Sequence, residues 1–114
     1  MNSLKSDGYH IHFYCEANEI EKCLAVRKQF VFDLKEVEGT GSVRKQPVGP
    51  HPLPMFESWF GHEHLDAVLR WAMLNRQGLS VMVHPLSGDD LADHRDHSLW
   101  LGKPLALNLG IFDE

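Results

Sequence analysis

The sequence predicts an α+β domain of ferredoxin-like type, with one antiparallel sheet and two helices on one of its faces. Three observations lead to this fold. Four short segments have the apolar or alternating patterns of strands, and two longer segments repeat apolar residues at helical spacing. Their order along the chain is strand–helix–strand–strand–helix–strand, which is typical of two split βαβ halves that share one sheet. The length of 114 residues suits a single domain covering residues 1–114.

The first half of the chain supplies a strand, a helix and a second strand. Residues 8–15 alternate and predict the first strand. Its two faces carry different side chains: Ile11, Phe13 and Cys15 on one, and His10, His12 and Tyr14 on the other. Asn18, with Glu21 three residues later, resembles a capping box and predicts a helix from about residue 18 to 33. Residues 39–41 predict a turn, and the polar residues 42–46 predict a short second strand.

The second half begins with a loop that proline makes rigid. Residues 47–54 contain four prolines around His51, and proline lacks the N–H that a helix or a central strand needs. The elements predicted after this loop are a strand at 55–60, a helix at about 62–77 ended by Gly78, a strand at 79–84, a polar turn-like stretch at 86–97, and an apolar segment at 99–112 interrupted at 102–104.

Composition and charge argue against several classes of function. The formal net charge is −5, and the basic residues come in pairs rather than in a stripe, which argues against nucleic acid as a partner. No run approaches the roughly 20 apolar residues of a membrane span, and the N-terminus lacks the apolar region of a signal peptide. Cys15 and Cys23 form neither a CxxC pair nor a disulfide framework. We therefore expect a soluble, cytoplasmic protein.

The predicted topology leaves one face of the sheet without helices. Tyr14, Trp59 and Met82 would lie on this face, which makes it too apolar to remain exposed to water. We expect a second subunit or the C-terminal segment to cover it. Sheet-on-sheet packing of a homodimer is the predicted assembly.

The histidines are the strongest indication of function, because eight occur in 114 residues and imidazole is the commonest metal ligand. The first and fourth predicted strands are antiparallel neighbours, so His10 and His12 should lie near His84 on one face. The rigid loop could bring His51 to the same point. We expect His12, His51 and His84 to converge on Zn, Fe, Ni or Cu. His10, His12 and His84 are the set to consider if His51 lies too far away, and hydrogen-bonded sheet histidines are the explanation without a metal.

Other polar residues could act beside these histidines. His94 lies between Asp93 and Asp96, a pattern that suits an imidazole oriented by carboxylates and acting as an acid–base group near neutral pH. Glu57 lies on an alternating segment and could face the site as a carboxylate ligand or base. The His-Glu-His segment at 62–64 lacks the HExxH spacing, so its histidines are expected on the surface.

Four segments occur in a specific order: His-Ile-His-Phe-Tyr at 10–14, Gly-Pro-His-Pro at 49–52 followed by Met-Phe-Glu at 55–57, His-Pro-Leu-Ser-Gly-Asp-Asp at 84–90 leading to Asp-His at 93–94, and Trp-Leu-Gly at 100–102. Together they resemble the DOPA 4,5-dioxygenase family over nearly the whole chain. The resemblance implies a ferredoxin-like fold of the dimeric α/β-barrel type. It also implies that the protein opens a catechol ring with O₂ at a non-haem iron.

The resemblance also implies roles for single residues. His12, His51 and His84 match the family's histidines in its strand, GPHP and HP segments, and His94 matches the one in its DH segment. Ser87 stands where threonine is common in the family. Fe(II) is the expected metal, with Zn or Ni as other occupants of the same three histidines and Glu57 as a candidate carboxylate ligand.

Extradiol cleavage needs an acid–base residue that removes a catechol proton and later returns one. His94 is the candidate, with His97 or His10 in support. Trp59, Trp100 and Tyr14 are candidates for the walls of an aromatic pocket. The expected substrates are O₂ and a DOPA-like or caffeate-like catechol. A protein of the same fold that binds a small molecule or a metal without catalysis is the alternative.

Overall fold

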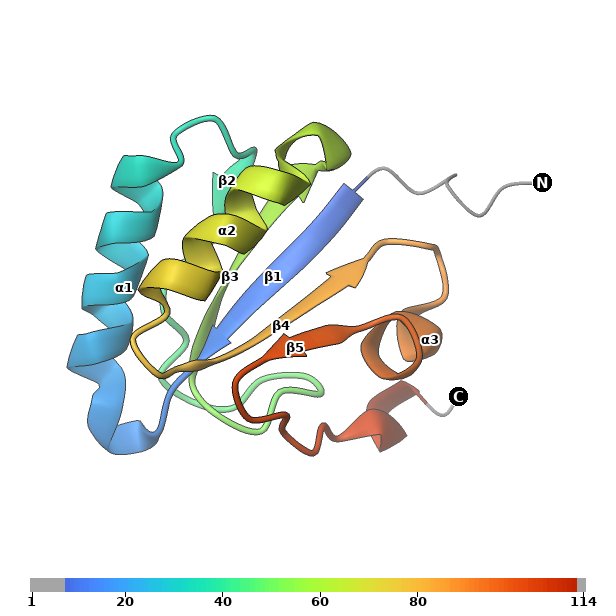
Figure 1. Cartoon of the computed structure of the whole chain (residues 1–114). Helices are drawn as coiled ribbons and strands as arrows, with labels where there is room; N and C mark the ends of the chain where they lie inside the picture. The colour runs from blue at the N-terminus through green and yellow to red at the C-terminus, as the bar shows by residue number, and fades with distance from the viewer. Residues whose placement is uncertain (1–7, 113–114) are drawn as a thin grey trace.

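Strand β1 (Gly8–Tyr14) lies at the centre of an open sheet of five antiparallel strands in the order β2-β3-β1-β4-β5 (Figure 1). This is a computed structural model, and it describes residues 8–112. The other strands are β2 (Gly39–Thr40), β3 (Met55–Gly61), β4 (Ser80–Pro85) and β5 (Leu99–Leu101). The helices are α1 (Ile20–Asp33), α2 (Leu65–Asn75) and α3 (Asp90–Arg95), with 3-10 turns η1 (Ala17–Glu19), η2 (His62–His64) and η3 (Leu109–Phe112).

The predicted order of strands and helices is confirmed from β1 to β4, and α1 and α2 cover the same face of the sheet (Figure 1). In the ferredoxin-like pattern each helix connects strands of one split βαβ half. The fifth strand, β5, extends the sheet beyond β4. The sheet of one chain is open, and the dimeric barrel stays a prediction.

The second strand differs from its predicted position. Thr40 pairs with Ser58 in β3, and the Ser58 hydroxyl donates to the Gly39 carbonyl at 2.7 Å. The predicted turn at 39–41 is therefore largely strand, and in the predicted strand at 42–46 a bridge forms at Arg44, opposite Met55. This pairing depends on contacts with the neighbouring strand β3, and the local sequence of residues 39–46 does not reveal those contacts.

Two further predictions about local structure were wrong. The stretch at 86–97 contains α3, whose N-cap Asp89 accepts a hydrogen bond from the Ala92 amide at 3.1 Å. The capping box at the first helix is formed by Glu16 and Glu19 rather than by Asn18 and Glu21. Both cases follow the same rule, in which an acidic side chain satisfies free amides at a helix start.

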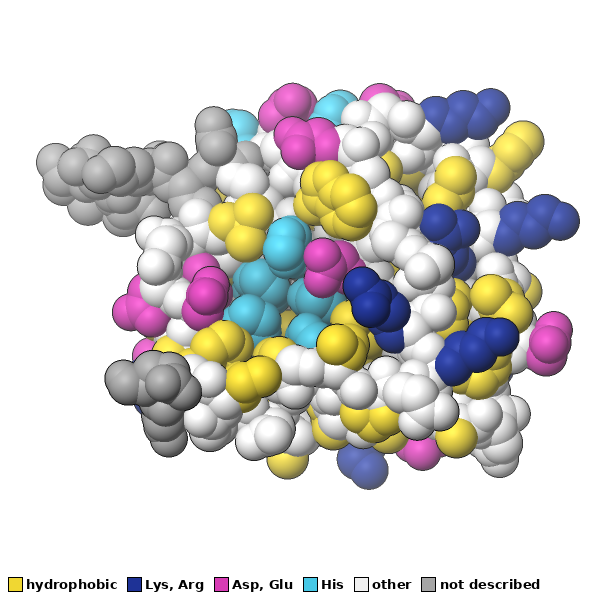
Figure 2. Space-filling view, turned by 180° about the vertical axis from the view of Figure 1, so that it is seen from behind, with side chains coloured by type: hydrophobic (Ala, Val, Ile, Leu, Met, Phe, Trp, Pro, Cys, Tyr) yellow, Lys and Arg dark blue, Asp and Glu magenta, His cyan; other side chains and the backbone are white. Residues whose placement is uncertain are grey.

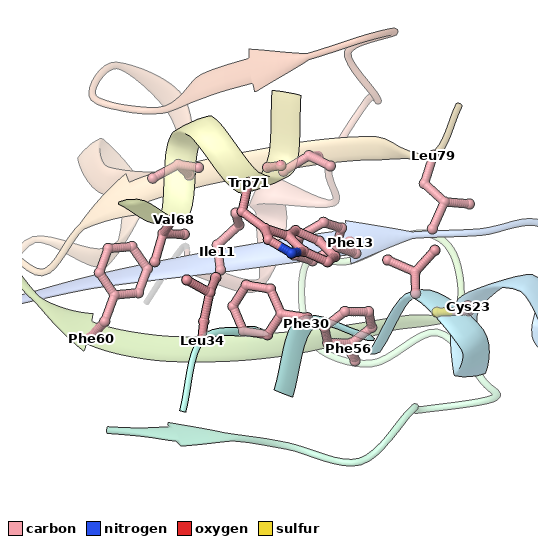
Figure 3. Packing of buried hydrophobic residues seen from close by; sticks show 14 of the residues in the cluster. Ile11, Phe13, Cys23, Phe30, Leu34, Phe56, Phe60, Val68, Trp71 and Leu79 are labelled. Carbon is pink, nitrogen blue, oxygen red and sulfur yellow. The ribbon is translucent and has the colours of Figure 1, made fainter. Parts of the chain in front are cut away.

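The main core lies between the sheet and the two long helices (Figure 3). Phe13 and Phe56 stack with ring centroids 4.7 Å apart, and Phe30 and Trp71 meet edge to face at 5.2 Å. The Trp71 indole N–H donates to the Asp33 carboxylate at 2.7 Å, which joins α2 to α1. These contacts bury one face of the sheet, so the chemistry of the site must lie on the other.

The face opposite the helices carries a second apolar cluster. Its buried members are Tyr14, Met55 and Met82, against which Leu53, Trp100, Leu105 and Leu107 pack. The Asn108 amide donates to the Pro50 carbonyl at 2.8 Å and ties the C-terminal segment to the proline loop. The C-terminal segment, one of the two predicted covers, therefore packs on this face. Within residues 8–112 no helix has the length and apolar character to cross a membrane.

Candidate functional site

The register of the central strands places polar side chains in two rows on the face without helices. In one row Trp59, His10 and His84 lie opposite one another on β3, β1 and β4, and in the next row Glu57, His12 and Met82 do so. Directly opposed residues of antiparallel strands share a face. The predicted alignment of His10 and His12 with His84 is thus confirmed by the register.

A loop and a short helix bring two more histidines to these strands. The His51 ring lies 4.3 Å from the His12 ring, and the His94 ring of α3 lies 4.3 Å from the His84 ring, measured between centroids. We call His10, His12, His51, His84 and His94 the histidine cluster. Figure 2 shows histidine side chains gathered in the middle of this face, with acidic and basic side chains directly beside them.

Two overlapping groups within the cluster have the spacing of metal ligands. His10, His12 and His84 form one group, and His12, His51 and His94 form the other, with ligand atoms within 4.8 Å of one another in each. His12 belongs to both. The predicted triad of His12, His51 and His84 is therefore divided between the two groups. The third member of the first group is His10 and that of the second is His94, and both were predicted as acid–base residues.

Hydrogen bonds define which ring nitrogens are available. Nδ1 of His84 lies 2.8 Å from the carbonyl oxygen of Pro85, which only accepts, so Nδ1 carries the proton and the lone pair of Nε2 can bind a metal. Nε2 of His12 lies 3.2 Å from that same Nε2 of His84. Nδ1 of His51 is 2.7 Å from the Tyr14 hydroxyl, which can donate or accept.

A divalent metal fits this arrangement. Two imidazole nitrogens on one ion, each at about 2.1 Å, lie roughly 3.0–3.4 Å apart in tetrahedral or octahedral geometry, and the His12–His84 separation is 3.2 Å. Nδ1 of His12 is buried without a hydrogen-bond partner among residues 8–112, although Glu57 Oε1 lies 3.6 Å from it. With a metal on Nε2, Nδ1 of His12 would carry its proton toward Glu57, the carboxylate–histidine arrangement common at metal sites.

His12, His51 and His84 are held neutral, the state in which imidazole binds metals. Burial, with the nearby imidazoles adding to it, lowers the pKa of His12 well below its ordinary value. Burial first, and then the neighbouring His94, lowers the pKa of His51 to about 4. Burial also lowers the pKa of His84 to about 4. Burial and the Glu57 charge raise the pKa of Tyr14, so its hydroxyl stays protonated.

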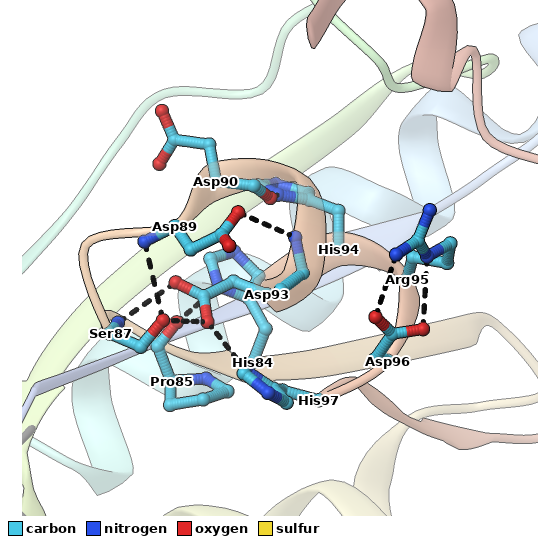
Figure 4. Close-up of polar contacts among 11 residues, drawn as sticks. His84, Pro85, Ser87, Asp89, Asp90, Asp93, His94, Arg95, Asp96 and His97 are labelled. Atoms are coloured by element: carbon cyan, nitrogen blue, oxygen red, sulfur yellow. Dashed lines mark hydrogen bonds and ion pairs between the residues drawn. The ribbon is translucent and has the colours of Figure 1, made fainter.

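The segment after β4 is organised by the carboxylate of Asp93 (Figure 4). This buried group accepts hydrogen bonds from the Ser87 amide at 2.8 Å, the Ser87 hydroxyl at 2.6 Å and Nδ1 of His97 at 3.0 Å. Burial alone would raise the pKa of Asp93, but these hydrogen bonds outweigh it and lower the pKa. Asp93 therefore fixes the turn between β4 and α3.

The predicted orientation of His94 by carboxylates was wrong. Nδ1 of His94 donates to the backbone carbonyl of Asp90 at 2.7 Å, because α3 places that carbonyl one turn earlier. Asp93 binds His97 instead, and Asp96 pairs with Arg95 at 2.9 Å. The carbonyl still fixes the ring and leaves Nε2 of His94 free. His97, with 46% of its side chain exposed, is held at the edge of this segment.

Two pockets adjoin the histidine cluster, with volumes of about 420 and 400 Å³. Glu57 and Trp59 line both, His51 lines the first and His10 lines the second. Trp59 is thus a pocket wall, as predicted. Tyr14 and Trp100 stack on each other at 5.8 Å in the apolar cluster and line neither pocket.

Sequence reasoning missed two residues that face the cluster. The Phe112 ring lies tilted against the His94 ring, with centroids 5.0 Å apart, and no local pattern marks this contact. Arg44 lines the first pocket, and only its pairing with Met55 could have indicated that. His62 and His64 lie on η2, exposed and half-buried, as expected for residues outside the site.

Comparisons with known proteins indicate the family of this chain. A family model described as the Dopa 4,5-dioxygenase family matches residues 9–111. The curated DOPA 4,5-dioxygenase of Amanita muscaria is 39% identical over 67 residues, which are 59% of this chain and 29% of that protein. An uncharacterized 21.2 kDa protein of Botryotinia fuckeliana is 39% identical over 75 residues, covering 59% of this chain and 41% of that protein. The matches thus span less than half the length of either relative.

A solved structure is similar to this chain over nearly its whole length. It comes from Nostoc punctiforme and is described as a "putative dioxygenase". It matches with a TM-score of 0.89 and 36% identity, over 99% of this chain and 96% of that one.

Proposed function

Because the chain belongs to the Dopa 4,5-dioxygenase family, we propose that it is a non-haem iron dioxygenase that opens the ring of a DOPA-like or caffeate-like catechol with O₂ by extradiol cleavage. The observation that carries this proposal is the facing pair of Nε2 atoms of His12 and His84, 3.2 Å apart, with the buried Nδ1 of His12 unpartnered within residues 8–112. Neutral, converging imidazoles are the donor set of a transition-metal centre.

In this proposal His12, His51 and His84 hold Fe(II), and Zn or Ni could occupy the same donors. The bound metal supplies a site at which a catechol and O₂ can exchange electrons. With the metal bound, Glu57, whose Oε1 lies 3.6 Å from Nδ1 of His12, would accept a hydrogen bond from that nitrogen and so orient the ring. Tyr14 does the same for His51 through the 2.7 Å hydrogen bond to Nδ1.

His94 is the proposed acid–base residue. Its ring is held between His84 and Phe112, with centroid distances of 4.3 and 5.0 Å. Nδ1 keeps its proton and donates it in a hydrogen bond to the Asp90 carbonyl, which leaves Nε2 to receive a proton from a catechol hydroxyl and return it. His10, which lines the second pocket, and His97, which donates to Asp93, are the proposed supporting residues.

The pocket beside the cluster can take an aromatic ring. Trp59 forms a wall shared by both pockets, and a volume of about 420 Å³ is sufficient for a catechol with a short side chain. The His51 and Glu57 side chains contribute to the same pocket, so a bound ring would lie next to the proposed metal ligands.

The decisive experiment reconstitutes the protein with Fe(II) under anaerobic conditions and adds a catechol panel and O₂. We expect O₂ uptake together with a yellow ring-opened product. Metal bound without turnover on any catechol contradicts the enzyme proposal. Ligand-dependent thermal stabilisation without product would instead support a non-catalytic binding protein.

Variants separate the ligands from the acid–base residue. Replacing His12, His51 or His84 by alanine should lower metal content at neutral pH, measured by elemental analysis after dialysis. His94→Ala should keep the metal and lose turnover. If His94→Ala loses the metal as well, the second group of His12, His51 and His94 is the ligand set, and the acid–base role of His94 is wrong.

A further inference from the structure

The segment after β2 contains one extra residue relative to β3. Thr40 lies opposite Ser58, and Arg44 lies opposite Met55. The chain therefore advances four residues from Thr40 to Arg44, whereas the paired segment of β3 advances three residues from Met55 to Ser58. This is a β-bulge, which redirects the side chains that follow it. Without the extra residue Arg44 would share the face of Thr40, whose hydroxyl is 3.1 Å from that of buried Ser58.

The bulge instead turns Arg44 to the face of the histidine cluster. The Arg44 and Met55 backbones exchange both hydrogen bonds, at 2.7 and 3.1 Å, so their side chains lie on the same face. Met55 packs there with Tyr14 and Met82. Arg27 of α1 fixes the start of the bulge by donating to the Gly41 carbonyl at 2.7 Å and the Thr40 carbonyl at 3.2 Å.

The guanidinium of Arg44 is free to bind a ligand. It is the one cationic side chain among the residues that line the two pockets beside the cluster. Within residues 8–112, its side chain makes no hydrogen bond or ion pair, even though the protein has a net charge of −5. Glu57, the one carboxylate of the first pocket, faces His10 and His12 at 3.9 and 3.6 Å rather than Arg44.

We propose that Arg44 binds a carboxylate on the side chain of the substrate, so that the site selects catechols that carry an acid group. This inference rests on the proposed function for the catechol ring. The planar guanidinium offers a carboxylate two parallel hydrogen bonds. The ring would then lie between Arg44 and the histidine cluster, along the wall formed by Trp59.

The test measures binding without turnover. The protein is loaded with Zn(II), which is redox-inert. It is then titrated calorimetrically with 3,4-dihydroxyphenylpropionate and with its methyl ester, two ligands that differ only in the carboxylate. Wild type should bind the acid about 10- to 100-fold more tightly than the ester. Arg44→Met should abolish this preference by weakening the acid alone, and Arg44→Lys should keep part of it.

Lys45→Met is the matched control, because it removes the same charge from the neighbouring residue, which lines neither pocket. It should keep the full preference. A wild type without preference for the acid, or an Arg44→Met protein that retains it, overturns the proposal. Loss of the preference in Arg44→Met supports it even if no ring opening is found. Ring opening with an unchanged preference in Arg44→Met refutes this inference and leaves the proposed function standing.

Discussion

The indole ring of Trp59 lies directly against the Cα of Gly39, its partner across the β2–β3 pair. A methyl group on Gly39 would overlap Cζ2, Cε2 and Nε1 of the indole. Trp59 lines both pockets beside the histidine cluster. Gly39 therefore leaves the space that the indole occupies and so helps to set the shape of the pocket wall.

Gly39→Ala should displace the indole and disturb both pockets. We expect a loss of about 1–3 kcal/mol in the free energy of unfolding, as for other overpacked sites, together with a shifted tryptophan fluorescence and weaker catechol binding. Gly110→Ala is the control, since its added methyl would meet its nearest neighbour, Oδ1 of Asn108, at an ordinary 3.6 Å and Gly110 lines neither pocket. Equal fluorescence and binding in the two variants would show that Gly39 has no special role.

Glu57→Gln should weaken metal binding without removing a proposed ligand. The amide is a poorer acceptor for the Nδ1 proton of His12, and loss of such a partner typically costs 10- to 100-fold in metal affinity. Competition with a chelator at neutral pH measures the change. Glu63→Gln is the control, because Glu63 pairs with His64 at 3.8 Å outside the cluster. If both variants hold metal like wild type, Glu57 does not orient His12.

The metal-free protein should lose stability as the pH falls from about 6.5 toward 4. The folded-state pKa values of His51 and His84 are lowered to about 4, so the unfolded chain binds more protons in that window and acid favours it. Each histidine contributes up to about 3 kcal/mol above pH 6.5, and this is lost through the window. Urea denaturation between pH 7 and 5 measures the slope, which His62→Ala should leave unchanged. A flat profile would contradict the burial of neutral histidines.

Asp93→Asn should destabilise the turn between β4 and α3. The carboxylate accepts three hydrogen bonds from Ser87 and His97, and an amide must present an NH₂ group to one of these donors. We expect a loss of about 2–3 kcal/mol by chemical denaturation. Asp89→Asn, at the N-cap of α3, should change stability by a few tenths of a kcal/mol at most, because asparagine caps as well as aspartate. Similar losses in both variants would refute the role of Asp93.

Alternation along the strands was enough to predict where two of the three proposed ligands lie. His12 and His84 share a face because side-chain direction has a period of two residues, and the antiparallel register then brings them together. The sequence also indicated that His51 sits on a stiff loop, although no local pattern specifies the direction in which that loop folds.

The remaining features depend on contacts between distant segments. The hydrogen bond of His94 to the Asp90 carbonyl requires α3, a helix of 6 residues that is too short to show a periodic pattern. The face of Arg44 depends on one extra residue in the pairing of β2 with β3. The contact of Phe112 with His94 joins segments that have no shared motif.

β1 and β4 each have hydrogen-bonded neighbours on both sides, whereas His51 comes from a loop. His12 and His84 are therefore stationary donors, and movement of the loop changes the distances from His51 to both of them. Ions of different radius would be accommodated by small shifts of residues 47–54, with the sheet unchanged. Metal preference should consequently respond to changes in this loop more than to changes in the apolar core.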